Sequence, residues 1–484
     1  MKTFRSTFIF ALVVVAVIGY AIFEVKRGEE LEIAEKAADR VFNWNEKDVS
    51  KVLIKRDNDS FEIVREEDNW KLTQPVQDRA DGFMVTNYLT SLLNQSAKEI
   101  EGNNEQWKDY GLENSTVDFI LTGPKEEVRK IQVSREEAYD GSYFLRQGKR
   151  LLVGNSEWKK LINKKSNEVR AKGLFHRSAP VIGFRIRVPG KKVSVQLEKK
   201  DGKWIYPKDL NIVISSKEVD KFIMDSTSFQ SVDFVAEEAG PKVLARFGLG
   251  SPQLTIDYWL EGEKQAGPHW WVKVSKAKIG NEGFAYHKDR QTIYSVPEDT
   301  VSLYTRTLND FRDKKYPFEF KKDVIQELSL KTRLTNLALV KQDGKWVASN
   351  PVKGKKVDQL KVKTLLDKLG EMEAKYYLGQ KRGKEFKKLV NTVVLKDNKG
   401  KEVLSVKWGA SFKAKKEEKT DSKEEEDFYY VKTNREKEML GVSVTAIDAL
   451  PGQTLLKDVS TEPSKKKDPA PMSKKAPVSS GTGS

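Results

Sequence analysis

Paired runs of alternating apolar and polar residues occur at three places along the chain. The paired runs are residues 52–54 with 61–65, 184–188 with 193–197, and 328–330 with 337–340. A period of two is typical of strands that bury one face, so each pair predicts two adjacent strands of a sheet. Residues that favour tight hairpin turns follow each pair, at Asp68-Asn69, Asp201-Gly202 and Asp343-Gly344.

A tryptophan and then a proline follow each of these turns. The three pairs are Trp70 with Pro75, Trp204 with Pro207, and Trp346 with Pro351. A Trp at the end of a hairpin strand most often buries its ring, so we interpret all three as core residues. An exposed platform on which a ligand stacks is the alternative interpretation, and three copies of it would make the chain a multivalent binder.

A helix start follows each Trp, at Asp81, Ser215 and Asp358. Each of these side chains is able to accept from a free amide at a helix N-terminus, and Ser215 with Glu218 also fits a capping box. Apolar residues then recur at helical spacing, with a single lapse at Ser226: Val85, Tyr88, Leu89, Leu92; Val219, Phe222, Ile223, Ser226; Val362, Leu365, Leu366, Leu369. The sequence therefore predicts one amphipathic helix in each copy.

A second landmark follows the helices in the same register. YGL at Tyr110, FGL at Phe247 and a degenerate FKKL at Phe386 each lead into a strand, and a further strand follows as YFLR, HWWVKV or FYYVK. The first two copies close with NEVRAKGLF and LNDFRDKKYPF. We predict an α+β fold of three tandem repeats, each a mostly antiparallel sheet with one main packed helix. At about 140 residues, each repeat is large enough for a core of its own.

An uncharged apolar segment, TFIFALVVVAVIGYAIF, begins at Thr7 behind Lys2 and Arg5. Its length approaches that of a membrane-spanning helix, and we expect an uncleaved anchor; a cleavable signal peptide is the alternative. A short basic leader favours a cytoplasmic N-terminus, so the rest of the chain would lie outside the cytoplasmic membrane. The predicted organisation is a cytoplasmic leader (1–6), a transmembrane anchor (7–25), a stalk (26–46), three modules (47–177, 178–321 and 322–457), a disordered insert in the third module (413–427) and a disordered basic tail (458–484).

The formal net charge of +16 invites a nucleic-acid interpretation, but lysine is interleaved with acid over the whole chain. No recognition helix, zinc finger or RNP pattern accompanies the charge, so we do not expect nucleic acid as a partner. Outside the membrane, such a surface would meet anionic lipid or envelope polymer. A solvated lysine-rich surface is the simpler interpretation.

Candidate chemistry is sparse. The chain has no cysteine, and its three histidines, His176, His269 and His287, have no metal-ligand spacing; His269 and His287 facing each other across a hairpin would be a weak metal signal. Nucleophile and phosphate-binding motifs are missing too, although a pair of catalytic carboxylates is not something one sequence excludes. We therefore predict no catalytic, cofactor-binding or metal-ligating residues, no cofactor and no enzymatic activity.

Taken together, these features resemble the repeats of the family called domain of unknown function 4340. The resemblance rests on the N-terminal anchor, the strand pairs ending in GKW, the proline, the capped helix, YGL before a strand and the closing R(D/A)K segment. It covers roughly residues 49–456, and the third copy departs from it through Lys387, which replaces the YGL glycine, and through its charged insert.

The resemblance also implies a role. Members of this family are similar to proteins encoded next to ABC-type transporter components, including those of gliding-motility type. We therefore expect a membrane-anchored, extracytoplasmic scaffold or accessory protein of the bacterial envelope, with the membrane and ABC transporter subunits as partners. An envelope binding module for anionic polymer or lipid is the alternative, and a cell-wall hydrolase is the third hypothesis.

Overall fold

The structure is a computed structural model and describes most of the chain from residue 39 to residue 458. The described residues are 18, 20, 23–27, 39–57, 59–101, 106–114, 116–176, 179–190, 195–264, 266–276, 282–287, 289–380, 388–415, 425–451 and 454–458. By its internal contacts the chain divides into two compact units, Met1–Glu198 with Lys221–Arg306, and Lys199–Asp220 with Thr307–Ser484.

Several sequence predictions fall outside the described residues. These are the leader, most of the anchor at 7–25, most of the stalk, the FKKL landmark at Phe386 and nearly all of the tail. None of the helices in the described part of the chain combines the length and the hydropathy that a bilayer crossing needs.

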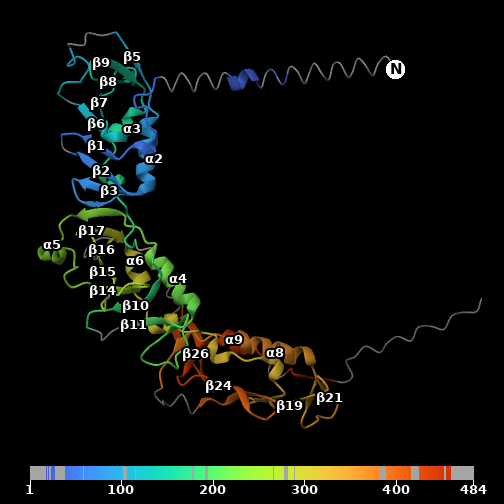
Figure 1. The fold of residues 1–484 in the computed structure, drawn as a ribbon. Coiled ribbons are helices and arrows are strands. Elements are labelled where there is room, and N and C mark those ends of the chain that lie inside the picture. Colours follow the sequence, from blue (N-terminus) through green and yellow to red (C-terminus); the bar gives the residue numbers. More distant parts are fainter. Residues whose placement is uncertain are drawn as a thin grey trace, which may run out of the picture. The chain divides into compact units, whose positions relative to one another are not determined.

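The first sheet has nine strands in the order β4-β3-β2-β1-β6-β7-β8-β9-β5. Its elements are β1 (Lys51–Lys55), β2 (Phe61–Glu66), β3 (Asn69–Gln74), β4 (Asp78–Arg79), α2 (Gly82–Leu93), β5 (Ala97–Glu99), β6 (Thr116–Thr122), β7 (Val128–Ser134), β8 (Tyr143–Gln147), β9 (Arg150–Gly154) and α3 (Trp158–Ile162). Every pair of neighbouring strands is antiparallel. Helix α2 connects one edge of the sheet to the other and lies along one of its faces (Figure 1).

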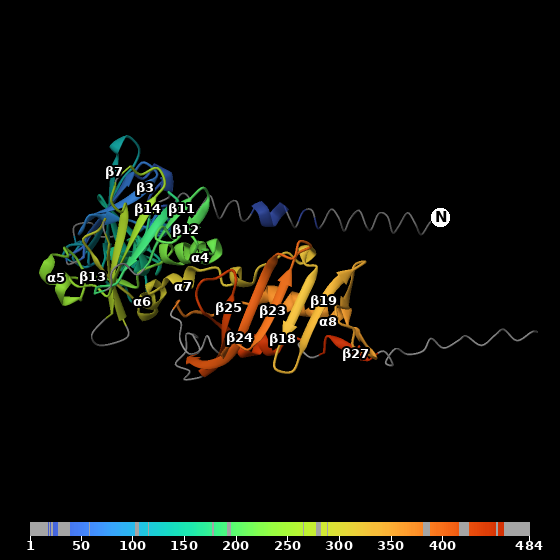
Figure 2. The ribbon, with the colours of Figure 1, turned by 90° about the horizontal axis from the view of Figure 1, so that it is seen from below.

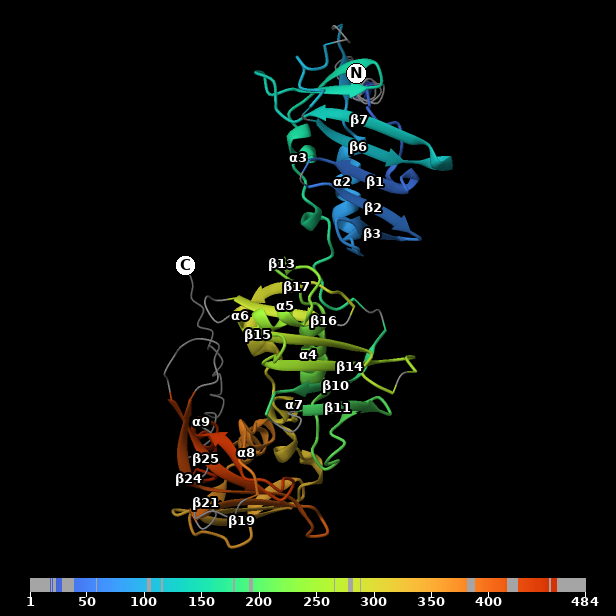
Figure 3. The same cartoon turned by 90° about the vertical axis from the view of Figure 1, so that its left-hand side faces the viewer.

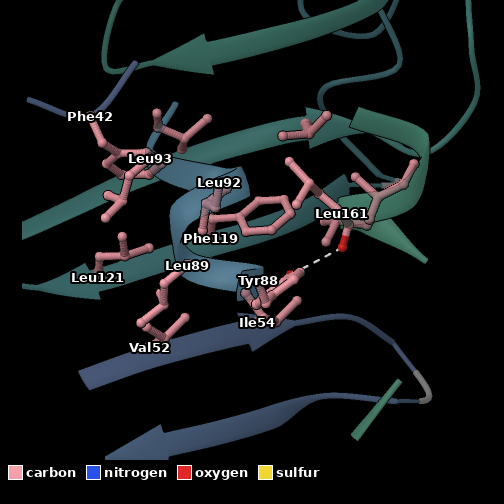
Figure 4. Close-up of a cluster of buried hydrophobic side chains, with 14 of the residues drawn as sticks. Phe42, Val52, Ile54, Tyr88, Leu89, Leu92, Leu93, Phe119, Leu121 and Leu161 are labelled. Atoms are coloured by element: carbon pink, nitrogen blue, oxygen red, sulfur yellow. Dashed lines mark hydrogen bonds between the residues drawn. The ribbon is translucent and has the colours of Figure 1, made fainter. Parts of the chain in front are cut away.

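The predicted apolar face of α2 forms the core of this sheet. Val85, Leu89 and Leu92 are fully buried, and Asp81 caps the helix by accepting from the Met84 amide at 3.0 Å. Tyr88 is also buried, and its hydroxyl donates to the Leu161 carbonyl oxygen at 3.1 Å (Figure 4). The cap and the spacing together explain why this segment is helical and which side it buries.

The end of the predicted stalk belongs to the same core. Val41, Phe42 and Trp44 are buried with the first sheet's apolar residues, and the amide of Val41 donates to the carbonyl of Gln95 at 3.0 Å. The prediction that the stalk runs to residue 46 is therefore wrong at its end, because apolar residues there have a packed surface to cover.

The second sheet has eight strands in the order β12-β11-β10-β14-β15-β16-β17-β13. Its elements are β10 (Val181–Arg187), β11 (Val195–Lys200), β12 (Lys203–Ile205), α4 (Ser216–Thr227), β13 (Asp233–Ala236), α5 (Pro241–Arg246), β14 (Leu254–Leu260), β15 (Trp270–Lys276), β16 (Glu282–His287), β17 (Ile293–Pro297), α6 (Glu298–Tyr304) and α7 (Leu308–Phe311). Figure 3 shows the run from β17 through β14 to β11.

Ser226, the polar residue on the apolar face of α4, has a structural role. It is buried, and its hydroxyl accepts from the Tyr258 hydroxyl at 2.9 Å. Its carbonyl accepts from the Tyr304 hydroxyl at 2.8 Å. A leucine at this position would leave the Tyr258 hydroxyl without an acceptor, and a buried polar group without a partner is costly.

The third sheet has eight strands in the order β20-β19-β18-β23-β24-β25-β26-β22, and a separate two-stranded sheet pairs β21 with β27. The elements are β18 (Glu327–Lys331), β19 (Asn336–Gln342), β20 (Lys345–Ala348), β21 (Lys355–Val357), α8 (Gln359–Glu371), β22 (Tyr376–Tyr377), β23 (Asn391–Lys396), β24 (Glu402–Lys415), β25 (Glu425–Thr433), β26 (Leu440–Ser443), α9 (Val444–Asp448) and β27 (Leu456–Asp458). Figure 2 shows β25, β24, β23, β18 and β19 side by side.

The prediction of a disordered insert at 413–427 is wrong at its two ends. Its two ends continue β24 and β25, with Lys413 opposite Asp427 and Lys415 opposite Glu425. The middle of the insert lies outside the described residues. Opposite charges facing each other across the two strands give this polar hairpin a favourable pairing that a count of apolar residues does not register.

All three sheets share the order of a three-stranded hairpin array, a four-stranded meander and a short edge strand, and the first sheet has β4 in addition, beside β3. The fold is therefore α+β and mostly antiparallel, and its organisation is repeat-like. The shared order also corrects one alignment, because YFLR and FYYVK are third strands of their meanders, whereas HWWVKV is a second strand. The equivalent third strand is β16, which ends at His287.

Two local predictions need correction. In the first copy the turn residues are Glu67 and Asp68, between β2 and β3, and Glu67 has a φ of 54°. In the second copy the Ser215 amide donates to the Phe311 carbonyl at 2.8 Å instead of to Glu218, so only the Ser215 half of the capping box forms. The turns at Gly202 and Gly344 are as predicted, with φ of 75° and 76°.

Candidate functional site

The segments that close the first two copies place an arginine at the same point of the fold. Arg170 forms a bridge with Ala80, just before the cap Asp81, and Arg312 forms one with Ile214, just before the cap Ser215. The residue before each arginine accepts a hydrogen bond from the cap amide at 2.8 Å. Equivalent backbone bonds thus hold the two arginines in equivalent places.

Arg170 is almost completely buried and lies between acidic groups from both sheets of the first unit. Its Nε donates to Asp78 Oδ2 at 2.7 Å, and its Nη1 donates to Glu237 Oε1 at 2.6 Å. The guanidinium also lies 3.8 Å from the centre of the Phe234 ring. We call Asp78, Arg170, Glu237 and Arg290 the first junction.

Arg290 completes the first junction. Its Nη2 donates to the same oxygen of Asp78, and its Nη1 donates to the Ala171 carbonyl at 2.8 Å. The other Asp78 oxygen accepts from the Arg79 amide at 2.7 Å. On the far side, Glu237 accepts from the Thr292 hydroxyl at 2.6 Å. Both Asp78 oxygens are therefore occupied.

Arg312 makes a matching set of contacts in the second unit. Its Nη1 donates to Glu438 Oε1 at 2.7 Å and its Nη2 to Glu436 Oε2 at 2.8 Å. The guanidinium lies 3.4 Å from the centre of the Tyr377 ring. We call Arg312, Tyr377, Glu436 and Glu438 the second junction. In both junctions an arginine from a closing segment meets an aromatic ring on the short edge strand, β13 or β22, and carboxylates of the copy that follows.

The third sheet has a leucine at this point. Leu456 pairs with Val357, just before the cap Asp358, and the Asp358 amide donates to the Leu455 carbonyl at 2.8 Å. Leu456 therefore stands where Arg170 and Arg312 stand in the earlier copies. It packs against the apolar core of the third sheet.

The charged groups around the first junction favour a structural role. Burial, reinforced by the positive charge of Arg290, lowers the pKa of Arg79 to about 10. A small groove of about 360 Å³ borders the cluster, and Trp70, Asp78, His176 and Asp289 help to line it. A general acid or base must exchange its proton with a substrate, whereas Asp78 is fully engaged with arginines and a backbone amide. The arrangement therefore joins the two sheets of the first unit.

The histidines do not come together as a metal site. His287 lies opposite Val272 across the hairpin, and His269 Nδ1 accepts from the Leu260 amide at 2.8 Å. The His287 ring is stacked between Trp270 and Tyr294, and burial, followed by the charge of Arg290, lowers the pKa of His287 to about 2. Within the described ranges, no group of three or more His, Cys, Asp or Glu residues is placed to hold a metal ion.

The three tryptophans are core residues, as the first interpretation predicts. Trp70, Trp204 and Trp346 are all buried. The Trp204 Nε1 donates to Asp220 on the second helix at 3.0 Å, and Arg65 covers the Trp70 ring at 4.4 Å. The alternative of an exposed stacking platform is wrong.

Sequence reasoning missed the junctions, although part of the signal was visible. The closing segments quoted above contain Arg170 and Arg312 in equivalent positions, and an arginine that recurs beside apolar residues is a candidate for a buried ion pair. Their partners Asp78, Glu237, Glu436 and Glu438 have no such marker, because nothing distinguishes them from the many surface carboxylates of the chain.

Two overlapping stretches, residues 70–243 and 204–390, match the family described as Domain of unknown function (DUF4340). Together they cover more than half of the chain. No curated protein and no solved structure matches it.

Proposed function

The chain belongs to the family of domain of unknown function 4340, and we propose that it is a membrane-anchored, non-enzymatic scaffold of the bacterial envelope that works beside an ABC-type transport system. In this proposal residues 7–25 anchor the chain in the cytoplasmic membrane. The three sheets are three copies of one module, and they lie on the extracytoplasmic side.

The first junction is the observation that carries the proposal. Arg170 joins Asp78 of the first sheet to Glu237 of the second, and a buried ion pair is favourable only when its geometry is good. An accessory protein that presents binding surfaces at fixed spacing needs such defined contacts between its modules. A catalyst would instead need a reactive group accessible to substrate.

The polar groups of the first unit support the same conclusion. His287 is neutral and stacked between rings, and Asp257, which is fully buried, is held by Arg185 at 2.8 Å and Arg187 at 2.9 Å. These groups have partners that fix them within the sheet.

Crosslinking in intact cells, followed by purification of the tagged full chain from membranes, tests the proposal. We expect subunits of an ABC-type transporter to be recovered with the chain. Arg170→Leu should reduce that recovery because the two sheets of the first unit lose one of the ion pairs that join them. Arg150→Leu, which removes an exposed ion pair with Glu99, is the matched control and should leave it unchanged. Recovery of the wild-type chain alone would contradict the proposal.

A further inference from the structure

The edge of the third sheet around Trp346 corresponds to the edge of the first sheet that is covered at the first junction. The groove beside Trp70 is lined by its own strands β3 and β4 and, in addition, by His176, Asp289 and Arg290. The corresponding groove beside Trp346 has a volume of about 730 Å³ and is lined by residues 345–348, 351 and 355–360 and by Leu456 and Lys457. We call it the Trp346 groove. Nothing from another copy lines it among the residues that the structure describes.

A single side chain, that of Gln359, satisfies the backbone of Trp346 beside the groove. In the first copy β4 pairs with β3, and the Ala80 amide donates to the Trp70 carbonyl at 3.0 Å. In the third copy β21 pairs with β27 instead. Gln359 takes the place of the missing backbone contact, because its Oε1 accepts from the Trp346 amide at 2.8 Å and its Nε2 donates to the Trp346 carbonyl at 2.7 Å. The backbone groups of Trp346 are therefore satisfied without another strand beside them.

The charge of the Trp346 groove selects its occupant. Lys345, Lys355, Lys356 and Lys457 line it, and all but Lys356 are exposed. One carboxylate, Asp358, also lines it, but its Oδ1 accepts from the amides of Leu360 and Lys361 as the helix cap. Lys355 occupies the position of Asp78, three residues before the helix cap, so a carboxylate of the first copy has become a cation. Beside the lysines, the side chain of Leu360 is 71% exposed and offers an apolar contact.

We propose that the Trp346 groove docks an acidic segment of a partner protein, in a contact like those that the first two closing edges make within the chain. Both junctions place carboxylates of the following copy against the closing edge, Glu237 in the first and Glu436 with Glu438 in the second. The third closing edge has lysines to receive carboxylates, and among the residues that the structure describes no carboxylate of another sheet lines it. This inference rests on the proposed scaffold function and names the surface that the partner contacts.

Charge excludes two other protein occupants. If a second copy of this chain bound here as the junctions bind, it would present the turn between β8 and β9 of its first sheet. This turn corresponds to the turns at Asp289 and Glu436 in the second and third sheets. That turn carries Lys149 and Arg150, and like charges would face each other. The residues after Asp458 include Lys465, Lys466 and Lys467, so the C-terminal segment of the chain is repelled for the same reason.

The test combines site-specific crosslinking with charge reversal in the full chain in its own membranes. A photo-crosslinking residue at Lys355 should give crosslinks that map to one Asp- and Glu-rich segment of a partner recovered with the wild-type chain. The double variant Lys345→Glu with Lys457→Glu should lower this crosslinking about tenfold, because each lysine changes from attraction to repulsion. Lys399→Glu with Lys401→Glu, two exposed lysines of another turn of the third sheet, is the control and should change nothing.

The outcomes separate the inference from the proposed function. If transporter subunits are recovered equally with the wild-type chain and the Lys345→Glu, Lys457→Glu variant, and Lys355 gives no crosslink to them, the scaffold proposal stands and the docking surface is wrong. If the wild-type chain is recovered alone, both fail. Crosslinks from Lys355 to residues 147–150 would identify a second copy and overturn the inference. Binding of phosphatidylglycerol vesicles that the same double variant abolishes, without a protein crosslink, would assign the groove to anionic lipid and overturn it too.

Discussion

Replacement of Arg170 by leucine measures the free energy that Arg170 contributes to the first junction. Leucine is the residue that the third copy carries at this point, as Leu456, so the backbone of the closing segment accommodates it. The substitution removes the cation that joins Asp78 to Glu237 and leaves both carboxylates in place. It adds no group that the fold does not already use at the equivalent site.

The free-energy cost of Arg170→Leu depends on the hydrogen-bond donors that Asp78 and Glu237 keep after the substitution. Removing one partner of a buried ion pair costs about 3–5 kcal/mol. Asp78 keeps Arg290, and Glu237 keeps the Thr292 hydroxyl, so neither carboxylate is left without a donor. We therefore expect a loss at the lower end, about 3 kcal/mol, or roughly a hundredfold in the equilibrium for local opening.

Hydrogen exchange followed by mass spectrometry measures this loss in the full chain, because protection of each peptide reports its own opening equilibrium. Peptides over residues 78–81, 168–173 and 233–237 should lose protection, and those over β18–β20 should not. Arg150→Leu removes an ion pair whose side chains are both 54% exposed, and such pairs contribute less than about 1 kcal/mol. A loss for Arg170→Leu no greater than that of this control would refute the assignment of Arg170 as the coupling residue.

Three further outcomes follow from individual side chains. Because the pKa of His287 lies at about 2 in the folded chain and at 6.5 when unfolded, its contribution to stability is complete above pH 6.5. It falls by about 1.4 kcal/mol per unit as the pH drops below that value, so urea unfolding at pH 6.5 and 5.5 should show a slope that His287→Phe lacks. Ser226→Ala removes the acceptor of the Tyr258 hydroxyl and should destabilise the first unit by about 1–3 kcal/mol; an unchanged denaturation midpoint would speak against this pairing. Asp358→Ala removes the N-cap of α8 and should cost about 1 kcal/mol by thermal unfolding, whereas Asp358→Asn should cost much less.

Most local features could be predicted from the sequence, because each depends on neighbours in the chain. The caps Asp81 and Asp358 and the turn at Gly344 each combine a residue type with a backbone conformation that favours it. The error in the first turn shows the limit of this reasoning. Asp68-Asn69 has suitable residues, yet the pairing of β2 with β3 places Glu67 at the positive φ, and strand register decides over turn preference.

The junctions could be predicted only in part, because they depend on contacts between distant segments. Arg170 recurs visibly in the closing segment, but its partner Glu237 follows an edge strand whose position is set by the whole meander. Ser226 is similar, since it looks like a defect in a helix until Tyr258 is brought next to it. The sequence thus marks one side of each buried polar contact and does not identify the other.

The crossing of each main helix from one edge of its sheet to the other has a consequence for how the chain folds. The first three strands pair locally, but β1 also pairs with β6, which joins Val52 to Leu121, and β10 pairs with β14, which joins Phe184 to Tyr258. Closing such long loops costs entropy before the contacts repay it, and pairing of distant strands slows folding. A chain that emerges from its N-terminus presents β1–β3 as a hairpin array whose inner edge stays unpaired until β6 follows. An unpaired edge is a template for wrong strand pairing, so a newly made molecule is prone to aggregation in the interval between synthesis of Ile54 and of Phe119.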